Sequence, residues 1–155
     1  MVRINIIHPK SLTDQHLIAE YDETLMLLGY VKRFPQVKII KGKSEIPPRY
    51  TLNKGHIKFF KDKLKYIKNR HELIKDEMRS RGFRPTKTIN LKEYPKSLHN
   101  DWTPKEDDFK IIIDRITQKI KMKPDYYRYN GKHHNHKHYI KLLHDHKKHS
   151  KAKKK

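Results

Sequence analysis

The chain of 155 residues carries 38 Lys and Arg against 17 Asp and Glu, a formal net charge of +21. Its length is that of about one domain. Cysteine is absent, which excludes disulfides, iron–sulfur clusters, thiolate zinc sites and cysteine nucleophiles. The apolar runs are too short for a membrane span or a signal peptide. We therefore expect an intracellular protein with a polyanionic partner, nucleic acid first and an anionic membrane surface second.

Residues 13–28 are the first segment with helical spacing. Ser11 or Thr13 can cap its start, and Gly29 is expected to end it. Its apolar line consists of Ile18, Tyr21, Leu25 and Leu28. A second face, at steps of four and three, carries His16, Glu20 and Glu23.

Residues 55–81 form the second predicted helix, with a strongly amphipathic pattern. Its apolar residues follow steps of three, four and seven: Ile57, Phe60, Leu64, Ile67, Ile74 and Met78. The pair Gly82 and Phe83 is typical of a glycine C-cap with its hydrophobic partner.

Residues 104–122 form the third predicted helix. The sequence Thr103-Pro104-Lys105-Glu106 is typical of a capping box with proline at the first helical position. The core stripe consists of Phe109, Ile112, Ile116 and Ile120. Between the helices, residues 34–52 and 84–102 contain several prolines and are expected to be irregular, and Val37–Ile40 is too short to predict a sheet.

The pattern as a whole predicts a mostly all-α fold. We expect a compact single domain of three main helices with long irregular loops at residues 1–132, followed by a basic tail at 133–155. From Lys132 onward the chain holds nine Lys and seven His against one acid, Asp145. Its few apolar residues cannot offset the entropy of ordering, so the tail is expected to be disordered or a loose helix.

The tail contains the run Lys132–His138, which reads K-H-H-N-H-K-H. Neutral imidazoles bind zinc or nickel, so a metal site is one interpretation of this run. A basic tail that contacts nucleic acid is the interpretation that the composition favours.

Composition alone leaves several functions open. A basic helical domain suits a helix-turn-helix regulator, an architectural DNA binder, a ribosomal-type RNA binder or a repair enzyme. The sequence shows no helix-turn-helix spacing, Gly-rich phosphate loop, H-E-x-x-H motif or carboxylate-rich metal cluster. We therefore expect neither a metal nor a cofactor. The acids Glu20, Asp22 and Glu23 would ordinarily belong to a solvated helix face.

Six motifs favour one of these functions by their order and spacing. They are Met1–Asn5, Asp14–Leu17, Ala19–Glu23, Gly55–Leu64, Arg81–Phe83 and Tyr126–Lys132. Over residues 1–132 this series resembles the pyrimidine-dimer DNA glycosylases of the phage endonuclease V type. The resemblance implies an enzyme that excises a base at ultraviolet-induced pyrimidine dimers and then cuts the strand at the abasic sugar. Its partner would be double-stranded DNA with damaged or abasic sites, bound by a monomer without membrane contact.

In this family the nucleophile is the α-amino group exposed when the initiator methionine is removed. The resemblance therefore implies the amine of Val2 after loss of Met1, although the family carries threonine at this place. An α-amine has a pKa of about 7.7–8.0, against about 10.4 for lysine, so a useful fraction is neutral at pH 7. The neutral amine attacks C1′ and forms a Schiff base, and β-elimination then releases the 3′ phosphate. No metal or cofactor is required.

Glu23 corresponds to the catalytic carboxylate of the family, and the alternative is a solvated surface acid. Arg3, Gln15 and His16 resemble residues that line the active site, whereas His16 alone would suggest a surface histidine. Glu20 is expected to balance a basic neighbour such as Arg3.

The segment Tyr126, Tyr127, Arg128 and Tyr129 interleaves aromatics with a cation, which suits base stacking and phosphate contact. Closure of the core by Tyr126 and Tyr129 is the alternative. Further phosphate contacts are expected from Lys32, Arg33, Lys61, Lys87 and Lys132.

Two further positions depart from the family pattern, in addition to Val2. Asp22 and Met26 stand where the family carries arginines on the catalytic helix, so charge-assisted phosphate contacts are lost there. A non-catalytic basic DNA- or RNA-binding protein is the alternative function. In either case we expect the protein to be associated with DNA or RNA inside the cell.

Overall fold

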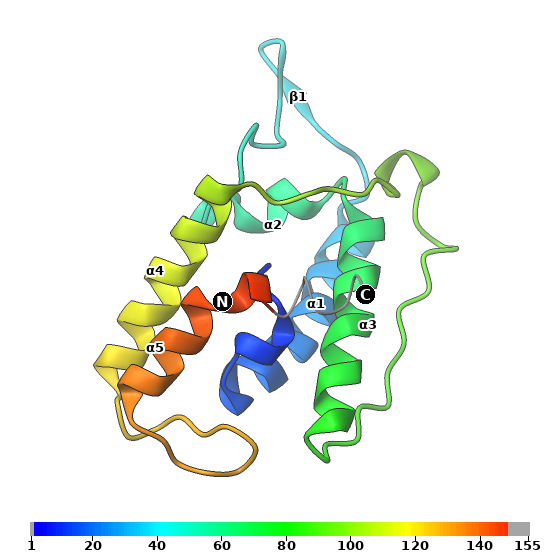
Figure 1. Cartoon of the computed structure of the whole chain (residues 1–155). Coiled ribbons are helices and arrows are strands. Elements are labelled where there is room, and N and C mark those ends of the chain that lie inside the picture. The colour runs from blue at the N-terminus through cyan, green and yellow to red at the C-terminus, as the bar shows by residue number, and fades with distance from the viewer. Residues whose placement is uncertain (1, 149–155) are drawn as a thin grey trace.

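The computed structural model describes residues 2–148, and within them the chain is mostly helical (Figure 1). The three long helices are α1 (Asp14–Arg33), α3 (Leu64–Ser80) and α4 (Glu106–Met122). Two shorter helices are α2 (His56–Phe60) and α5 (His136–His144). One hairpin is formed by β1 (Ile39–Ile40) and β2 (Lys43–Ser44). This confirms the mostly all-α fold with three main helices and long loops.

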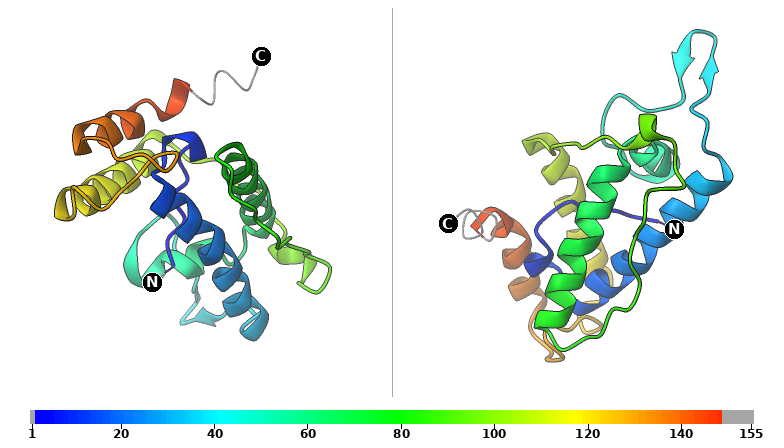
Figure 2. Two further views of the ribbon diagram at one scale, coloured as in Figure 1. Left: turned by 90° about the horizontal axis from the view of Figure 1, so that it is seen from below. Right: turned by 90° about the vertical axis from the view of Figure 1, so that its right-hand side faces the viewer.

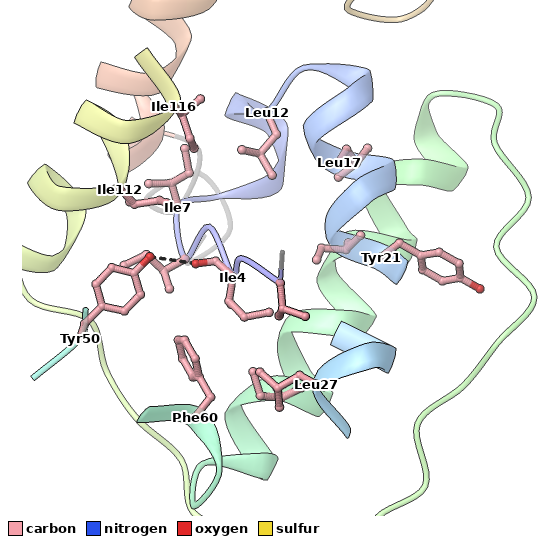
Figure 3. Packing of buried hydrophobic residues seen from close by; sticks show 14 of the residues in the cluster. Ile4, Ile7, Leu12, Leu17, Tyr21, Leu27, Tyr50, Phe60, Ile112 and Ile116 are labelled. Atoms are coloured by element: carbon pink, nitrogen blue, oxygen red, sulfur yellow. Dashed lines mark hydrogen bonds between the residues drawn. The ribbon is translucent and has the colours of Figure 1, made fainter. Parts of the chain in front are cut away.

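The helices form two groups around the start of the chain. Helices α1 and α3 pack together, and α4 packs with α5 on the other side (Figures 1 and 2). The N-terminal segment, residues 2–8, runs between the groups, and its Ile4 and Ile7 are fully buried in the common core (Figure 3). No helix within residues 2–148 is long and apolar enough to cross a membrane.

Helix α1 begins as expected and ends later. The Thr13 hydroxyl accepts a hydrogen bond from the His16 amide at 3.2 Å, which caps the first turn. The expected end at Gly29 is wrong, because the helix continues to Arg33. Val31, in the last turn and two residues before the true end, is fully buried. Burial of this further turn outweighs the roughly 1 kcal/mol penalty of glycine inside a helix.

The second predicted helix is two helices rather than one. Helix α2 ends at Phe60, and Lys63 has a non-helical backbone before α3 begins. The Lys63 ammonium donates to the Phe59 carbonyl at 2.8 Å and lies 4.0 Å from the centre of its ring. The break allows both Phe59 and Phe60 to be buried, which an amphipathic stripe cannot predict.

The glycine cap predicted after α3 is confirmed. Gly82 has a φ of +89°, in the left-handed region. Its amide donates to the Arg79 carbonyl at 3.0 Å, and the Phe83 amide donates to the Met78 carbonyl at 2.9 Å. These two bonds define a Schellman motif.

Helix α4 begins two residues later than predicted. Its N-cap is Lys105, and the Asp108 carboxylate accepts a hydrogen bond from the Lys105 amide at 2.8 Å. The predicted capping box of residues 103–106 is therefore displaced along the chain, because Asp108 supplies the acceptor at the third helical position. The buried stripe agrees with the prediction at Ile112, Ile116 and Ile120.

Of the two alternatives expected for the tail, disorder is wrong for residues 136–144 and a helix is found there. These residues form α5, in which Tyr139 and Leu143 are each 1% exposed. The Tyr139 hydroxyl donates to the Tyr127 carbonyl at 2.9 Å and accepts from the His134 amide at 2.8 Å. Two apolar residues on one helix face suffice because α4 supplies the surface that covers them. Residues 149–155 lie outside the described part, and the boundary at residue 132 stays a prediction.

If α5 belongs to the core, truncating its buried tyrosine will destabilise the whole domain. We expect Tyr139→Ala to lower the free energy of unfolding by about 3–5 kcal/mol, as for other buried aromatic residues. The measurement is chemical denaturation followed by circular dichroism. His138→Ala, at the exposed neighbouring position, is the matched control and should change stability little. Equal stability of both variants would contradict the packing of α5.

Candidate active site

The N-terminal segment is held in place by side chains, because it joins neither helix nor sheet. The Ile4 amide donates to Nε2 of His56 at 2.7 Å, and the Tyr50 hydroxyl donates to the Ile4 carbonyl at 2.9 Å (Figure 3). Further along, the Arg70 guanidinium donates to the Ile7 carbonyl. These buried contacts give the segment one fixed course up to residue 2.

His56 can accept this bond only in one tautomer. Its Nδ1 lies 2.9 Å from the Thr51 carbonyl, so Nδ1 carries the proton and Nε2 is left to accept from Ile4. Burial lowers the pKa of His56, which keeps the ring neutral. The neutral ring thereby fixes the backbone two residues from Val2.

Glu23 lies on α1 beside the start of the chain. Its carboxylate accepts a hydrogen bond from the backbone amide of Arg3, the residue that follows Val2. Burial, and then the negative charge of Glu20, raise the pKa of Glu23 to about 7, although the Arg3 guanidinium opposes the shift. Glu23 is therefore present in both protonation states near neutral pH.

Glu20 does not balance Arg3 as expected, because its partner is Arg70. The pair is bidentate, with Nε to Oε2 at 2.6 Å and Nη2 to Oε1 at 2.9 Å. Both side chains are almost completely buried, at 2% and 0% exposure. Removing either partner would leave an uncompensated buried charge, at a cost of about 3–5 kcal/mol.

His16 is a buried residue rather than a surface histidine. Its ring stacks on Tyr127 with centroids 4.7 Å apart, and its Nδ1 lies 2.9 Å from the Thr13 hydroxyl. Burial lowers the pKa of His16 to about 3, with smaller contributions from the positive charges of Arg3 and Lys119. At neutral pH His16 therefore contributes packing and hydrogen bonding but no positive charge.

Gln15 fastens the tyrosine-rich segment to α1. Its Nε2 donates to the Tyr126 carbonyl at 3.2 Å, and its Oε1 accepts from the Arg128 amide at 2.9 Å. Tyr127 lies in the core, whereas Tyr126 is 55% exposed. Of the two tyrosines, it is Tyr126 that remains available for a partner.

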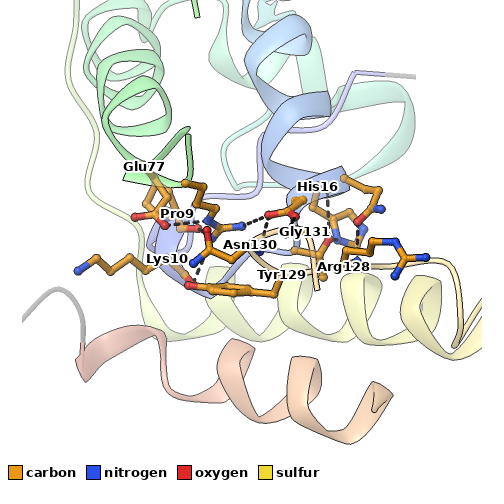
Figure 4. Close-up of polar contacts among 12 residues, drawn as sticks. Pro9, Lys10, His16, Glu77, Arg128, Tyr129, Asn130 and Gly131 are labelled. Atoms are coloured by element: carbon orange, nitrogen blue, oxygen red, sulfur yellow. Dashed lines mark hydrogen bonds and ion pairs between the residues drawn. The ribbon is translucent and has the colours of Figure 1, made fainter. Parts of the chain in front are cut away.

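Asp14 holds the turn that follows this segment (Figure 4). Its carboxylate accepts from the amides of Asn130 and Gly131 at 3.0 and 2.8 Å. It also accepts from Arg81 at 3.0 Å, whose guanidinium carbon lies 4.0 Å from the Tyr129 ring centre. Tyr129 thus stacks on Arg81 inside this cluster, at the junction of α1, α3 and the turn.

The expected phosphate-binding cations lie in different surroundings. Exposed positions are occupied by Lys32, Arg33, Lys87, Arg128 and Lys132, and Lys32 pairs with Glu93 at 3.0 Å. The surface position expected for Lys61 is wrong, because that side chain is 1% exposed. Its ammonium donates to the Gln36 carbonyl and to the Glu45 carboxylate instead.

The structure therefore joins some of the predicted residues and separates others. At the end of the N-terminal segment, where the Val2 side chain is buried, Arg3 lies near His16, Glu23 and Tyr127. Gln15, Tyr126 and Arg128 contact one another next to His16 and Tyr127 in the chain. Tyr129 and Lys132 belong to the adjacent turn, where they are bridged to each other. Arg33 lies at the far end of α1, Lys87 in the loop after α3, and Lys61 is internal.

Sequence reasoning missed the side chains that hold the N-terminal segment: Tyr50, His56 and Arg70. One signal was present in the apolar stripe of α3, which steps by seven from Ile67 to Ile74. Arg70 and His71 fill this gap and are both buried. A charged residue at a core position of an amphipathic helix indicates a buried partner.

Metal ligation gains no support from the residues that the structure describes. In residues 2–148 no group of three or more His, Asp or Glu side chains is arranged to hold a metal ion. In the histidine-rich run the rings of His134 and His138 stack, with centroids 4.5 Å apart.

The site combines a fixed N-terminal segment, a half-buried carboxylate and exposed cations on a chain of net charge +21. A charge of this size suits a protein that acts on nucleic acid. The family of pyrimidine dimer DNA glycosylases matches residues 1–91, more than half of the chain, and the protein belongs to this family. It is accordingly a DNA-repair glycosylase, an enzyme that binds DNA. The matched range contains α1, α2 and α3, and the tyrosine-rich segment lies beyond it.

The low pKa of His16 predicts how stability depends on pH. The unfolded chain takes up a proton at His16 near pH 6.5, whereas the folded chain resists until about pH 3. The contribution of neutral His16 is therefore complete above pH 6.5 and is lost as the pH falls below it, by about 2 kcal/mol at pH 5. His16→Phe keeps the aromatic stack and should lose less stability over this range. Urea unfolding of both proteins at neutral pH and at pH 5 measures the loss of stability of each. An equal loss in the unmodified protein and in His16→Phe would contradict the assignment.

Proposed function

We propose that the protein excises damaged bases at pyrimidine dimers and then cleaves the abasic strand by β-elimination through a Schiff base. The nucleophile is the α-amine of Val2, exposed after Met1 is removed, and Met1 itself lies outside the described residues. One observation carries this proposal. The Glu23 carboxylate accepts a hydrogen bond from the Arg3 amide, which places a carboxyl group with a pKa of about 7 beside residue 2. The Val2 side chain is buried and anchors the residue.

The first step uses the neutral form of the terminal amine. Its lone pair attacks C1′, the bond from C1′ to the damaged base breaks, and the departing base carries away the bonding electrons. The nitrogen then loses one proton, and the C1′–O4′ bond opens as O4′ takes its bonding electrons and accepts a proton, which gives a protonated Schiff base. A terminal amine suits this step because its pKa, about 7.7–8.0, leaves a neutral fraction at pH 7.

The second step uses the carboxylate form of Glu23. The iminium draws electrons from the sugar, so the 2′ proton becomes acidic, and Glu23 accepts it as the 3′ phosphate leaves. The same carboxylate stabilises the positive charge that develops on the sugar. A pKa near 7 suits a group that must accept and return protons at neutral pH.

DNA is held by the exposed residues around this centre. We propose that Arg3, Tyr126, Arg128 and Lys132 contact the damaged duplex, with Arg33 and Lys87 binding phosphates further away. Gln15, His16, Tyr127 and Tyr129 position these groups. Asp22 and Met26 are exposed on α1 next to Glu23. Because one is an acid and the other is uncharged, neither supplies a cation that could contact the DNA there. The protein acts as a DNA-associated monomer without metal or cofactor.

Borohydride reduction tests the proposed intermediate. We expect a covalent adduct with an oligonucleotide that contains an abasic site, because the reagent reduces the imine. The adduct should be lost when the α-amine is acetylated. Glu23→Gln should slow strand cleavage by at least about 10²-fold, as for other general acid–base residues. Mass spectrometry of the intact chain first establishes that Met1 is absent.

The control for this experiment is Asp22→Asn, which removes an exposed carboxylate next to Glu23 and should leave the adduct in place. If the chain lacks Met1 and still forms no adduct, the proposed chemistry is wrong. Salt-dependent DNA binding without cleavage or lesion preference would then favour the non-catalytic alternative.

The raised pKa of Glu23 predicts the pH dependence of the elimination step. The amine is already bound in the imine at this stage, so its titration as a free amine no longer limits the rate, and the acid limb of the pH profile reports Glu23. We expect the rate of strand cleavage from the preformed imine to be half-maximal at about pH 7 and to fall at lower pH, as Glu23 becomes protonated. Rapid-quench measurements after a pH jump give this rate. A rate that stays constant down to about pH 5 would show an ordinary glutamate pKa and contradict the role.

A further inference from the structure

The β1–β2 hairpin projects from the body of the protein just after α1 (Figures 1 and 2). Ile39 pairs with Ser44 and Ile40 with Lys43. At its tip Lys41 and Gly42 have φ values of +52° and +78°. Two consecutive left-handed residues define a type I′ turn, which matches the twist of a hairpin. The projection is therefore a regular two-stranded ribbon.

The tip exposes apolar side chains that no part of the described chain covers. Ile39 is 72% exposed and Ile40 is 63% exposed. Neighbouring residues of a strand point to opposite faces, so both faces of the ribbon present an isoleucine. An exposed pair of this kind on a hairpin that reaches into solvent suggests a partner.

Charge indicates the chemistry of that partner. Three lysines flank the isoleucines on the hairpin, namely Lys38, Lys41 and Lys43, and all are exposed. The one nearby acid, Glu45, is turned inward, where it binds Lys61 at 3.1 Å and the Lys38 amide at 2.6 Å. The only charge that the hairpin exposes is thus positive, and it lies beside apolar surface, as in groove-binding segments of DNA-binding proteins.

The hairpin is braced from below by the buried Lys61. Its ammonium joins the Gln36 carbonyl, before β1, to the Glu45 carboxylate, after β2. The Glu45 amide also donates to the Lys38 carbonyl at 2.8 Å, which closes the base of the ribbon. Burying the Lys61–Glu45 ion pair costs desolvation free energy. Because the pair lies at the base of the hairpin, it holds the two strands in one conformation before a partner binds.

The hairpin is separated from the candidate active site by a length of α1 that corresponds to several base pairs of DNA. Exposed residues at steps of four, three and four lead along α1 from that site: Asp22, Met26, Gly29 and Arg33. The ten residues from Glu23 to Arg33 span about 15 Å of helix, or roughly four to five base pairs of duplex. The hairpin begins beyond this point, on the side of the molecule that carries α1 (Figure 2).

We propose that the β1–β2 hairpin is a second DNA-contact element, which enters a groove of the duplex at least four to five base pairs from the lesion. Lys41 and Lys43 contact phosphates, and Ile39 and Ile40 lie against the sugars and base edges. This inference rests on the proposed function in so far as the partner is DNA, but it does not depend on the Schiff-base chemistry.

The test compares two duplexes that contain a stable abasic analogue, with about 4 or about 15 base pairs on either side. Lys41→Asn with Lys43→Thr removes two charges while keeping residue types that suit the turn and strand. On the long duplex we expect the slope of log K against log salt to become less negative by about 1.8. Ile39→Thr with Ile40→Thr should weaken binding on the order of tenfold with little change in slope. On the short duplex both variants should bind like the unmodified protein.

The matched control is Lys110→Gln with Lys121→Gln, two exposed lysines of α4, the helix that packs with α5 rather than next to the hairpin. The proposal is overturned if the hairpin variants match this control on the long duplex or lose affinity equally on both duplexes. It is also overturned if sedimentation without DNA shows that the isoleucines join two copies of the chain. Cleavage of a natural abasic site by the same variants reports separately on the proposed function, since the chemistry can fail while the hairpin still binds.

Discussion

The structure depends on the need to satisfy the backbone of a buried N-terminal segment, residues 2–8, that has no regular secondary structure. An irregular segment in a core leaves amides and carbonyls without partners unless side chains provide them. Arg70 meets this need for Ile7 and at the same time carries a charge, so it needs Glu20 in turn. The buried ion pair is thus a consequence of placing the terminus in the core. Helices α1 and α3, which supply the two partners, must hold a fixed separation for it to form.

The same pair links the fold to the chemistry. Glu20 lies one helical turn from Glu23, and its fixed negative charge helps to raise the pKa of that carboxyl to about 7. Arg3 opposes this shift, so the pKa of Glu23 reflects burial first and then the opposing charges of these two neighbours. His16 adds no charge, because burial keeps its ring neutral. The candidate active site is therefore tuned by a few buried groups rather than by the large positive charge of the whole chain.

Contacts between residues close in the sequence could be predicted, whereas contacts between distant residues could not. Thr13 as an N-cap and Gly82 as a C-cap were predictable, because each contact spans only a few residues. The proximity of Glu23 to residue 2 followed from the family resemblance alone, since no spacing rule joins residues twenty apart. The partners of Ile4 come from residues 50 and 56, about fifty positions away. Their roles become visible only when the tertiary fold brings them to the terminus.

Lys61 and Tyr139 show why composition misleads at particular positions. A lysine in a very basic chain suggests a phosphate contact, yet Lys61 is buried because two chain segments offer it oxygen acceptors. A histidine- and lysine-rich tail suggests disorder, yet Tyr139 inserts into the core because α4 offers it an apolar surface. In both cases the neighbours decide the outcome rather than the residue type. Lys61 is therefore not available to bind phosphate. The exposed lysines in this region are instead Lys38, Lys41 and Lys43 on the hairpin that Lys61 braces.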